Sequence, residues 1–167
     1  MKEEAITQKV GEVLIIGPPG ANHRKLLTTV CPRPQKSEQN MEFGRMEIDS
    51  DLALFLYAIT YNQKKPAIAW DLIARKMLGV IIMFNWADQE SLQAAKHILD
   101  FFNAKFEAPC VLAADVPHGA LPVNKKIAFP YISLSPREKF LFCNSNSGKS
   151  MKLTLATLIN LVSNYAV

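Results

Sequence analysis

Short, continuously apolar runs alternate along the chain with stretches whose apolar residues recur at helical spacing. Runs such as VLIIG (13–17) and GVIIMFN (79–85) show no polar alternation, which is typical of strands buried on both faces. The predicted strands are 13–17, 43–49, 52–58, 79–85, 109–114, 139–143 and, inside the irregular proline-rich segment 116–138, one near 129–132. The predicted helices are 21–30, 66–78, 88–104 and 152–164.

This order of elements predicts an α/β fold with three layers. We expect a mostly parallel sheet of about six strands, with one antiparallel edge strand and helices on both faces. The polar, proline-containing stretch 31–40 predicts a loop. No repeat or linker interrupts the pattern, so residues 1–167 are expected to form a single domain. Ligands of such sheets bind beyond the carboxyl ends of the strands. Those ends are 17–25, 57–63, 85–88, 115–119 and 144–149.

Composition limits the classes of protein to which the chain can belong. It is 49% hydrophobic and 20% charged, as globular domains are. Its net charge of +4 comes from scattered lysines, so we expect no nucleic-acid partner. The three cysteines, Cys31, Cys110 and Cys143, form no C-x-x-C pair, which disfavours disulfides and a zinc site. No signal peptide or membrane-spanning run is visible, so we expect a cytoplasmic protein.

The segment CNSNSGKS (143–150) ends in the Gly-Lys-Ser that closes a phosphate-binding loop. Cys143, however, stands where that loop requires its first glycine. The simpler interpretation is a polar start to the last helix, with Ser147 or Ser145 as the N-cap. The alternative is a second phosphate site that uses Lys149.

The stretch MEFGRMEIDSDLALFLYAITYNQ (41–63), followed by AWDLIARKMLGVIIMFN (69–85), resembles a known protein family. The similarity is to the Ras-like small GTPases, and within them to the bacterial ATP/GTP-binding proteins related to the gliding-motility GTPase. This resemblance implies a P-loop GTPase-like fold. It also implies a protein partner of the roadblock type, because such proteins are often encoded beside members of this group.

The turn after the first strand departs from the family's phosphate-binding motif. In GPPGANHRK (17–25), Gly17 and Gly20 match the motif, while Asn22 replaces its last glycine. His23 replaces the phosphate-binding lysine, and Arg24 replaces the hydroxyl residue that holds magnesium. Without these groups, a nucleotide's phosphates lack their point charge and Mg²⁺ lacks a ligand.

Parts of this turn still suit an anion. The backbone N–H groups from Gly20 through Ala21 to Lys25 remain, and asparagine is the non-glycine residue best able to hold a positive φ at position 22. Weak binding of GTP, GDP or phosphate is therefore an open alternative, although the sequence predicts neither a cofactor nor a bound metal.

The family's other motifs are altered as well. YAITYNQ (57–63) stands in place of F-G-T-P-G-Q, and only Gln63 matches the glutamine that positions the attacking water. The guanine-reading N-K-x-D becomes DVPH, so Asp115 replaces the asparagine and His118 replaces the aspartate that would pair with guanine. A site without that carboxylate discriminates poorly between bases.

We therefore interpret the chain as a pseudo-GTPase: an interaction or regulatory module in which GTP hydrolysis is absent or very weak. The main alternative is an NTPase of relaxed base specificity that uses Arg24, Lys25 or Lys149 in place of the missing lysine. A receiver-like signalling domain fits less well, because its carboxylates after the first strand are missing. At a protein interface we expect the segments 31–42 and 57–66, centred on Tyr57, Tyr61, Asn62 and Lys64. In the alternative interpretation, Tyr57 and Tyr61 cover an empty nucleotide pocket.

Overall fold

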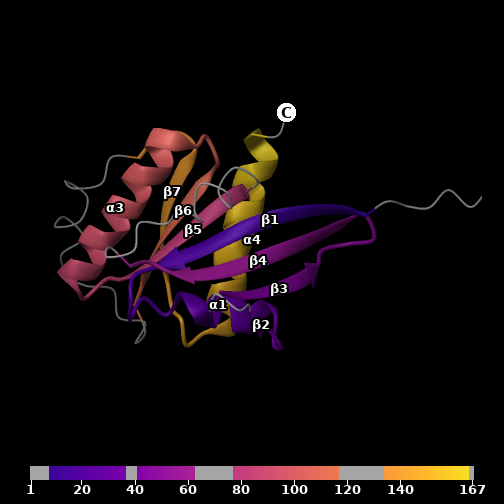
Figure 1. Ribbon diagram of the computed structural model, residues 1–167, viewed down its shortest axis with the longest axis horizontal. Coiled ribbons are helices and arrows are strands. Elements are labelled where there is room, and N and C mark those ends of the chain that lie inside the picture. The colour runs from indigo at the N-terminus through magenta and orange to yellow at the C-terminus, as the bar shows by residue number, and fades with distance from the viewer. Residues whose placement is uncertain (1–7, 37–40, 63–76, 117–133, 166–167) are drawn as a thin grey trace, which may run out of the picture.

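A computed structural model describes residues 8–36, 41–62, 77–116 and 134–165. They form one seven-stranded sheet in the order β2-β3-β4-β1-β5-β6-β7 (Figure 1). The strands are β1 (Lys9–Gly17), β2 (Gln35–Lys36), β3 (Glu42–Glu47), β4 (Leu52–Thr60), β5 (Met77–Asn85), β6 (Cys110–Asp115) and β7 (Glu138–Cys143). The helices in this part of the chain are α1 (His23–Val30), α3 (Gln89–Lys105) and α4 (Gly148–Tyr165).

The sheet is mostly parallel, as the sequence predicts. β1 lies at its centre and pairs in parallel with both β4 and β5, and β6 and β7 continue in the same direction. β3 runs antiparallel to β4, and the two-residue β2 pairs with the outer side of β3. The α/β class and the antiparallel strand near one edge are thus confirmed.

Helices cover both faces of the sheet and give three layers (Figure 1). α1 and α4 contact each other on one face, where they close a core that we call the α1-side core. α3 lies on the opposite face and closes the α3-side core. The strands supply alternate residues to the two cores, and for this reason their sequences read as continuous apolar runs. In β1, for example, Val13 and Ile15 face α1, whereas Leu14 and Ile16 face α3.

Several element boundaries differ from the prediction for local reasons. β4 continues to Thr60 because it stays paired with β1, with Thr60 opposite Gly17. Met77 and Leu78 belong to β5 rather than to the end of a helix. The predicted loop 31–40 contains β2, which the adjacent strand induces by pairing. α1 begins at His23 instead of residue 21 because Asn22 has a left-handed backbone conformation that a helix excludes.

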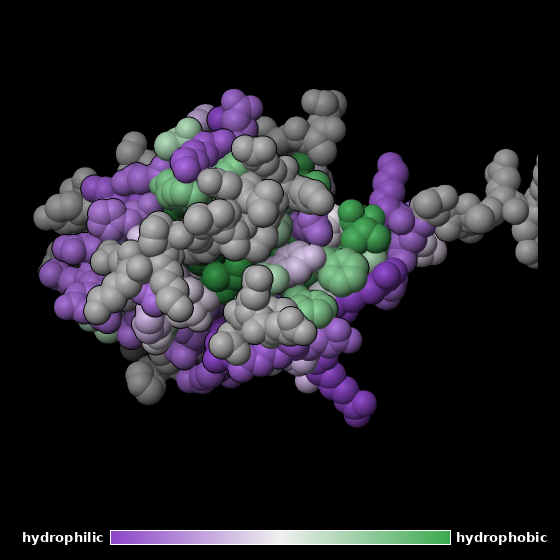
Figure 2. All heavy atoms as spheres, in the orientation of Figure 1, coloured by the Kyte–Doolittle hydropathy of each residue, from purple (hydrophilic) through white to green (hydrophobic). Residues whose placement is uncertain are grey.

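Polar side chains gather over α3 on the face shown in Figure 2, and apolar side chains emerge toward the outer ends of β1 and β4. Val10 of β1 is 50% exposed, and Phe55 and Tyr57, in the middle of β4, are half-buried. No helix of the described residues is long and apolar enough to span a bilayer. Most of the predicted helix 66–78 and the strand near 129–132 lie outside the described residues.

Candidate functional site

At the carboxyl ends of β1 and β5, the chain turns toward opposite faces of the sheet. β1 leads to α1 on one face, and β5 leads to α3 on the other. The two strands are direct neighbours. A crevice at such a point is the usual ligand site of open α/β sheets, because the two connecting loops separate there. The loops that follow these two strands therefore define the candidate site.

The turn after β1 contains two residues with left-handed backbone conformations. Gly20 has φ 83° and Asn22 has φ 61°, the only positive φ values among the described residues. The N–H of Ala21 donates to the carbonyl of Pro18 (3.1 Å), and the N–H of Lys25 donates to that of Asn22 (3.0 Å). The predicted ability of asparagine to hold a positive φ at position 22 is confirmed.

His23, at the position where the resemblance expects the phosphate-binding lysine, points into the protein. Its side chain is 3% exposed, and Nε2 lies 3.1 Å from the Thr60 hydroxyl. Nδ1 is buried near Gly17 and has no hydrogen-bond partner among the described residues. Burial, helped by the neighbouring Arg24 and opposed by Glu42, lowers the pKa of His23 to about 4. The imidazole is therefore neutral at pH 7 and offers no positive charge to a ligand.

The two cations that follow His23 have partners in neighbouring elements. Arg24 forms an ion pair with Glu42 of β3. Lys25 donates from Nζ to the side-chain oxygen of Asn146, in the loop before α4 (3.0 Å). Both side chains are exposed, and both connect α1 to the elements beside it. Neither of these two partners belongs to the turn at residues 17–22.

Asp115, at the end of β6, connects two of these loops. Its carboxylate is fully buried (0% exposed) and accepts three hydrogen bonds. Asn22 donates from Nδ2 to Oδ2 (2.9 Å), the Ser145 hydroxyl donates to the same oxygen (2.8 Å), and the Ser145 N–H donates to Oδ1 (2.8 Å). The sequence identified Asn22 and Asp115 as members of separate motifs and gave no indication that they touch.

The segment CNSNSGKS forms an ordinary helix start. Of the two N-cap candidates, Ser147 accepts the N–H of Ser150 (3.2 Å), whereas Ser145 is bonded to Asp115. The N–H of Asn144 donates to the Ser150 hydroxyl (2.8 Å), and Lys149 is exposed. Burial and the nearby Asp115 raise the pKa of the Cys143 thiol to about 12, so this cysteine behaves as a small apolar residue.

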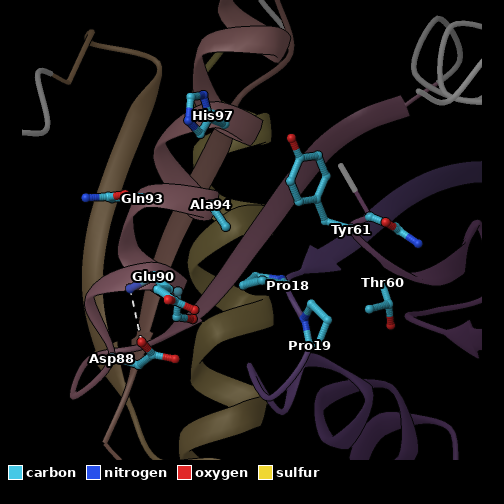
Figure 3. A pocket seen from close by; sticks show the side chains of 11 residues that line it. Pro18, Pro19, Thr60, Tyr61, Asp88, Glu90, Gln93, Ala94 and His97 are labelled. Atoms are coloured by element: carbon cyan, nitrogen blue, oxygen red, sulfur yellow. Dashed lines mark hydrogen bonds between the residues drawn. The ribbon is translucent and has the colours of Figure 1, made fainter. Parts of the chain in front are cut away.

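A cavity of about 840 Å³ opens between the turn after β1 and the first turns of α3. Figure 3 shows Pro18 and Pro19 facing α3 across it, with Tyr61 on the side of β4. Asp88 is the N-cap of α3 and accepts the N–H of Glu90 (3.0 Å). The described lining residues include two carboxylates and neither lysine nor arginine. They are Pro18, Pro19, Thr60, Tyr61, Asn62, Asp88, Glu90, Ser91, Gln93, Ala94 and His97.

The two tyrosines expected at an interface occupy different places. Tyr57 lies in the middle of β4, not in the loop after it, and its hydroxyl donates to Glu12 (3.1 Å). Tyr61 follows β4, donates its N–H to the carbonyl of Gly17 (2.8 Å) and lines the cavity. Three other candidates, Gln63, Lys64 and His118, lie outside the described residues.

Comparison of the chain with models of protein families and with curated proteins found no match. Within the residues that the structure describes, no three His, Cys, Asp or Glu side chains are grouped closely enough to hold a metal ion. The arrangement at this edge of the sheet therefore has to be interpreted from its own chemistry. That chemistry consists of a turn with two positive φ values, a neutral buried histidine, a bonded carboxylate and a cavity whose described lining carries two carboxylates.

Proposed function

We propose that this protein is a protein-interaction module on a small-GTPase-like domain, and that it neither hydrolyses GTP nor depends on a nucleotide. One observation carries the proposal, namely that the residue in the lysine position, His23, is buried and neutral at pH 7. A triphosphate carries several negative charges, and enzymes that transfer its phosphoryl groups place lysine, arginine or Mg²⁺ against them.

The surroundings of the turn support the same conclusion. Arg24 and Lys25, the candidate substitutes for the missing lysine, contact Glu42 and Asn146 instead. Asp88 and Glu90 line the cavity beside the turn, and their charges would repel phosphates. A ligand of this cavity is thus expected to be neutral or positively charged, which suits side chains of a protein better than a nucleotide.

A second candidate function, weak nucleotide or phosphate binding, is favoured by the backbone of the turn. Positive φ values at Gly20 and Asn22, directly before α1, are typical of loops whose N–H groups surround an anion. This candidate needs affinity from backbone groups alone, because the side chains that usually assist them are absent or engaged. Its affinity should therefore be low.

The proposed partner is a roadblock-type protein, on the basis of the family resemblance. We place the contact at the rim of the cavity, where Tyr61 and the exposed Asn62 follow β4. Aromatic side chains often anchor interfaces because they bury a large area at a low entropic cost. Tyr57 is not part of this proposal, since its hydroxyl is engaged by Glu12 within the sheet.

The first experiment measures nucleotide content and GTP turnover of the purified protein. We expect no co-purified nucleotide and a hydrolysis rate equal to that of a buffer blank, with or without Mg²⁺. A magnesium-dependent turnover that disappears in Gln63→Ala would contradict the proposal and support the NTPase alternative.

The second experiment measures capture of a roadblock-type protein from the same source in the presence of GTP, GDP or neither. We expect equal capture in the three conditions and a clear loss in Tyr61→Ala. Tyr57→Phe serves as the matched control, because it removes one hydroxyl at a position within the sheet. Capture that requires GTP would show a working nucleotide switch and would overturn the proposal.

A further inference from the structure

Side chains join two loops to the end of a strand at the carboxyl edge of the sheet. Asn22 comes from the turn after β1, Asp115 ends β6, and Ser145 lies in the loop after β7. The Asp115 carboxylate receives a hydrogen bond from Asn22 and two from Ser145, all between 2.8 and 2.9 Å. Asp115 and Ser145 are buried and Asn22 is half-buried, so water competes little for the two bonds from Ser145 and more for the bond from Asn22.

The Asp115 carboxylate determines which atoms its partners must turn toward it. An ionised carboxylate only accepts hydrogen bonds, so the amide of Asn22 must turn its nitrogen toward Asp115. The same side chain belongs to a residue whose backbone has the left-handed conformation. The bond to Asp115 therefore holds the unusual turn in place, and bonds to a charged group are among the stronger ones in proteins.

In α/β proteins that bind a ligand at this edge, the ligand contacts several loops and so holds them together. Here the chain provides that connection itself. We propose that Asn22, Asp115 and Ser145 form an internal clasp that holds the turn after β1 and the loop after β7 to the end of β6 with no ligand bound. The clasp deepens the proposed function, on which one consequence rests: the turn after β1, to which Tyr61 is bonded, keeps the same form with or without GTP.

The contact between Lys25 and Asn146 joins the same two regions at the surface and provides an internal comparison. Both of its side chains are exposed, so solvent weakens the bond. If the burial and charge of Asp115 stabilise the clasp, removing the contact between Lys25 and Asn146 should raise hydrogen exchange in the loops far less than a substitution of Asn22 does.

The test is amide hydrogen exchange of residues 20–25 and 144–147 in the full chain. Asn22→Asp places a second carboxylate against Asp115, and we expect exchange in both loops to rise about 10- to 100-fold, the size expected for the loss of a bond to a charged group. Asp115→Asn alone should have a smaller effect, because the Asn22 amide can rotate and accept a bond from the new amide.

The decisive variant combines Asn22→Asp with Asp115→Asn, which exchanges the acceptor and the donor across the same contact. We expect it to restore protection to within about threefold of the wild type. Asn146→Ala is the matched control and should leave both loops close to the wild-type rate. The clasp is overturned if Asn22→Asp leaves exchange unchanged, or if the double variant exchanges as fast as Asn22→Asp.

Addition of GTP or GDP separates this inference from the proposed function. Nucleotide should not slow exchange in the wild type. If it does, the nucleotide-independent function is wrong, whereas the clasp is still judged by the rescue of Asn22→Asp. If the rescue fails while nucleotide has no effect, only the clasp is wrong.

Discussion

Two segments of this chain contain glycines and polar residues like those of a phosphate-binding loop. The first differs from the motif in its side chains, and the second differs from it in its backbone. The turn at 17–25 lacks the motif's lysine and hydroxyl residue but reverses the chain with positive φ at Gly20 and Asn22. The segment at 143–150 has the Gly-Lys-Ser letters but forms a regular helix start capped by Ser147.

The difference teaches that the backbone, and not the motif's last three letters, decides whether a loop can enclose an anion. A strand must lead into the loop, the loop must reverse with positive φ values, and a helix must follow. Only the first segment meets these conditions. Gly17 and His23 of this segment are tightly packed, so substituting them should be far more damaging than substituting Gly148 or Lys149 of the second segment.

The largest expected effect is a loss of stability in acid that depends on His23. Its pKa is about 4 in the folded protein and 6.5 in the unfolded chain, so the unfolded chain binds the proton more tightly. This contribution is complete above pH 6.5 and is lost as the pH falls toward 4, by about 3 kcal/mol. Urea unfolding at pH 7 and pH 4 should show this difference between the wild type and His23→Gln. An equal acid loss in both proteins would contradict it.

The next effect concerns the glycine that opens the first turn. A Cβ atom on Gly17 would lie 2.7 Å from the carbonyl oxygen of Met83, 2.8 Å from Cβ of Ala21 and 2.9 Å from Nδ1 of His23. The first of these neighbours is backbone, so it cannot rotate away. We expect Gly17→Ala to lower the free energy of unfolding by about 1 to 3 kcal/mol, measured by urea denaturation. An unchanged midpoint would show that the turn is looser than the structure indicates.

The matched glycine in the second segment should respond in the opposite direction. A Cβ atom on Gly148 would meet only Cγ2 of Thr29, at an ordinary distance of 3.8 Å. Since Gly148 is the first residue of α4, alanine should stabilise the protein by up to about 1 kcal/mol. The same denaturation experiment checks this, and a destabilisation near that of Gly17→Ala would remove the contrast between the loops.

The smallest effect is expected for the lysine of the second segment. Lys149 is exposed, so Lys149→Ala should shift stability by no more than about 0.5 kcal/mol. It should also leave any affinity for inorganic phosphate or GDP unchanged, as measured by calorimetry. A tenfold loss of affinity would instead place an anion at residues 145–150.

Sequence predicted those features that depend on local pattern. The buried strands 13–17 and 79–85 were identifiable because residues that serve two cores must all be apolar. The positive φ of Asn22 was predictable because few residues other than glycine tolerate it. The start of α3 was equally clear, since Asp88 has the form of an N-cap.

Features that depend on distant contacts could not be predicted. The bonds among Asn22, Asp115 and Ser145 join residues that only the folded sheet brings together. A buried carboxylate at the end of an apolar strand was the one available signal, because such a group needs donors nearby. β2 was missed because two residues of strand carry no pattern of their own.

The two faces of the sheet are completed by parts of the chain that are made at different times. Among the described residues, the fully buried ones of the α3-side core lie at or before Ala114, and Phe140 and Phe142 of β7 pack against them, whereas the α1-side core also needs Met151, Leu155 and Leu158 of α4. During synthesis most of the α3-side core can thus assemble while the α1-side core, including Leu26 and Leu27, still lacks its cover. Uncovered apolar surface of this kind favours aggregation. We therefore expect the nascent chain to be a substrate for chaperones until α4 has left the ribosome.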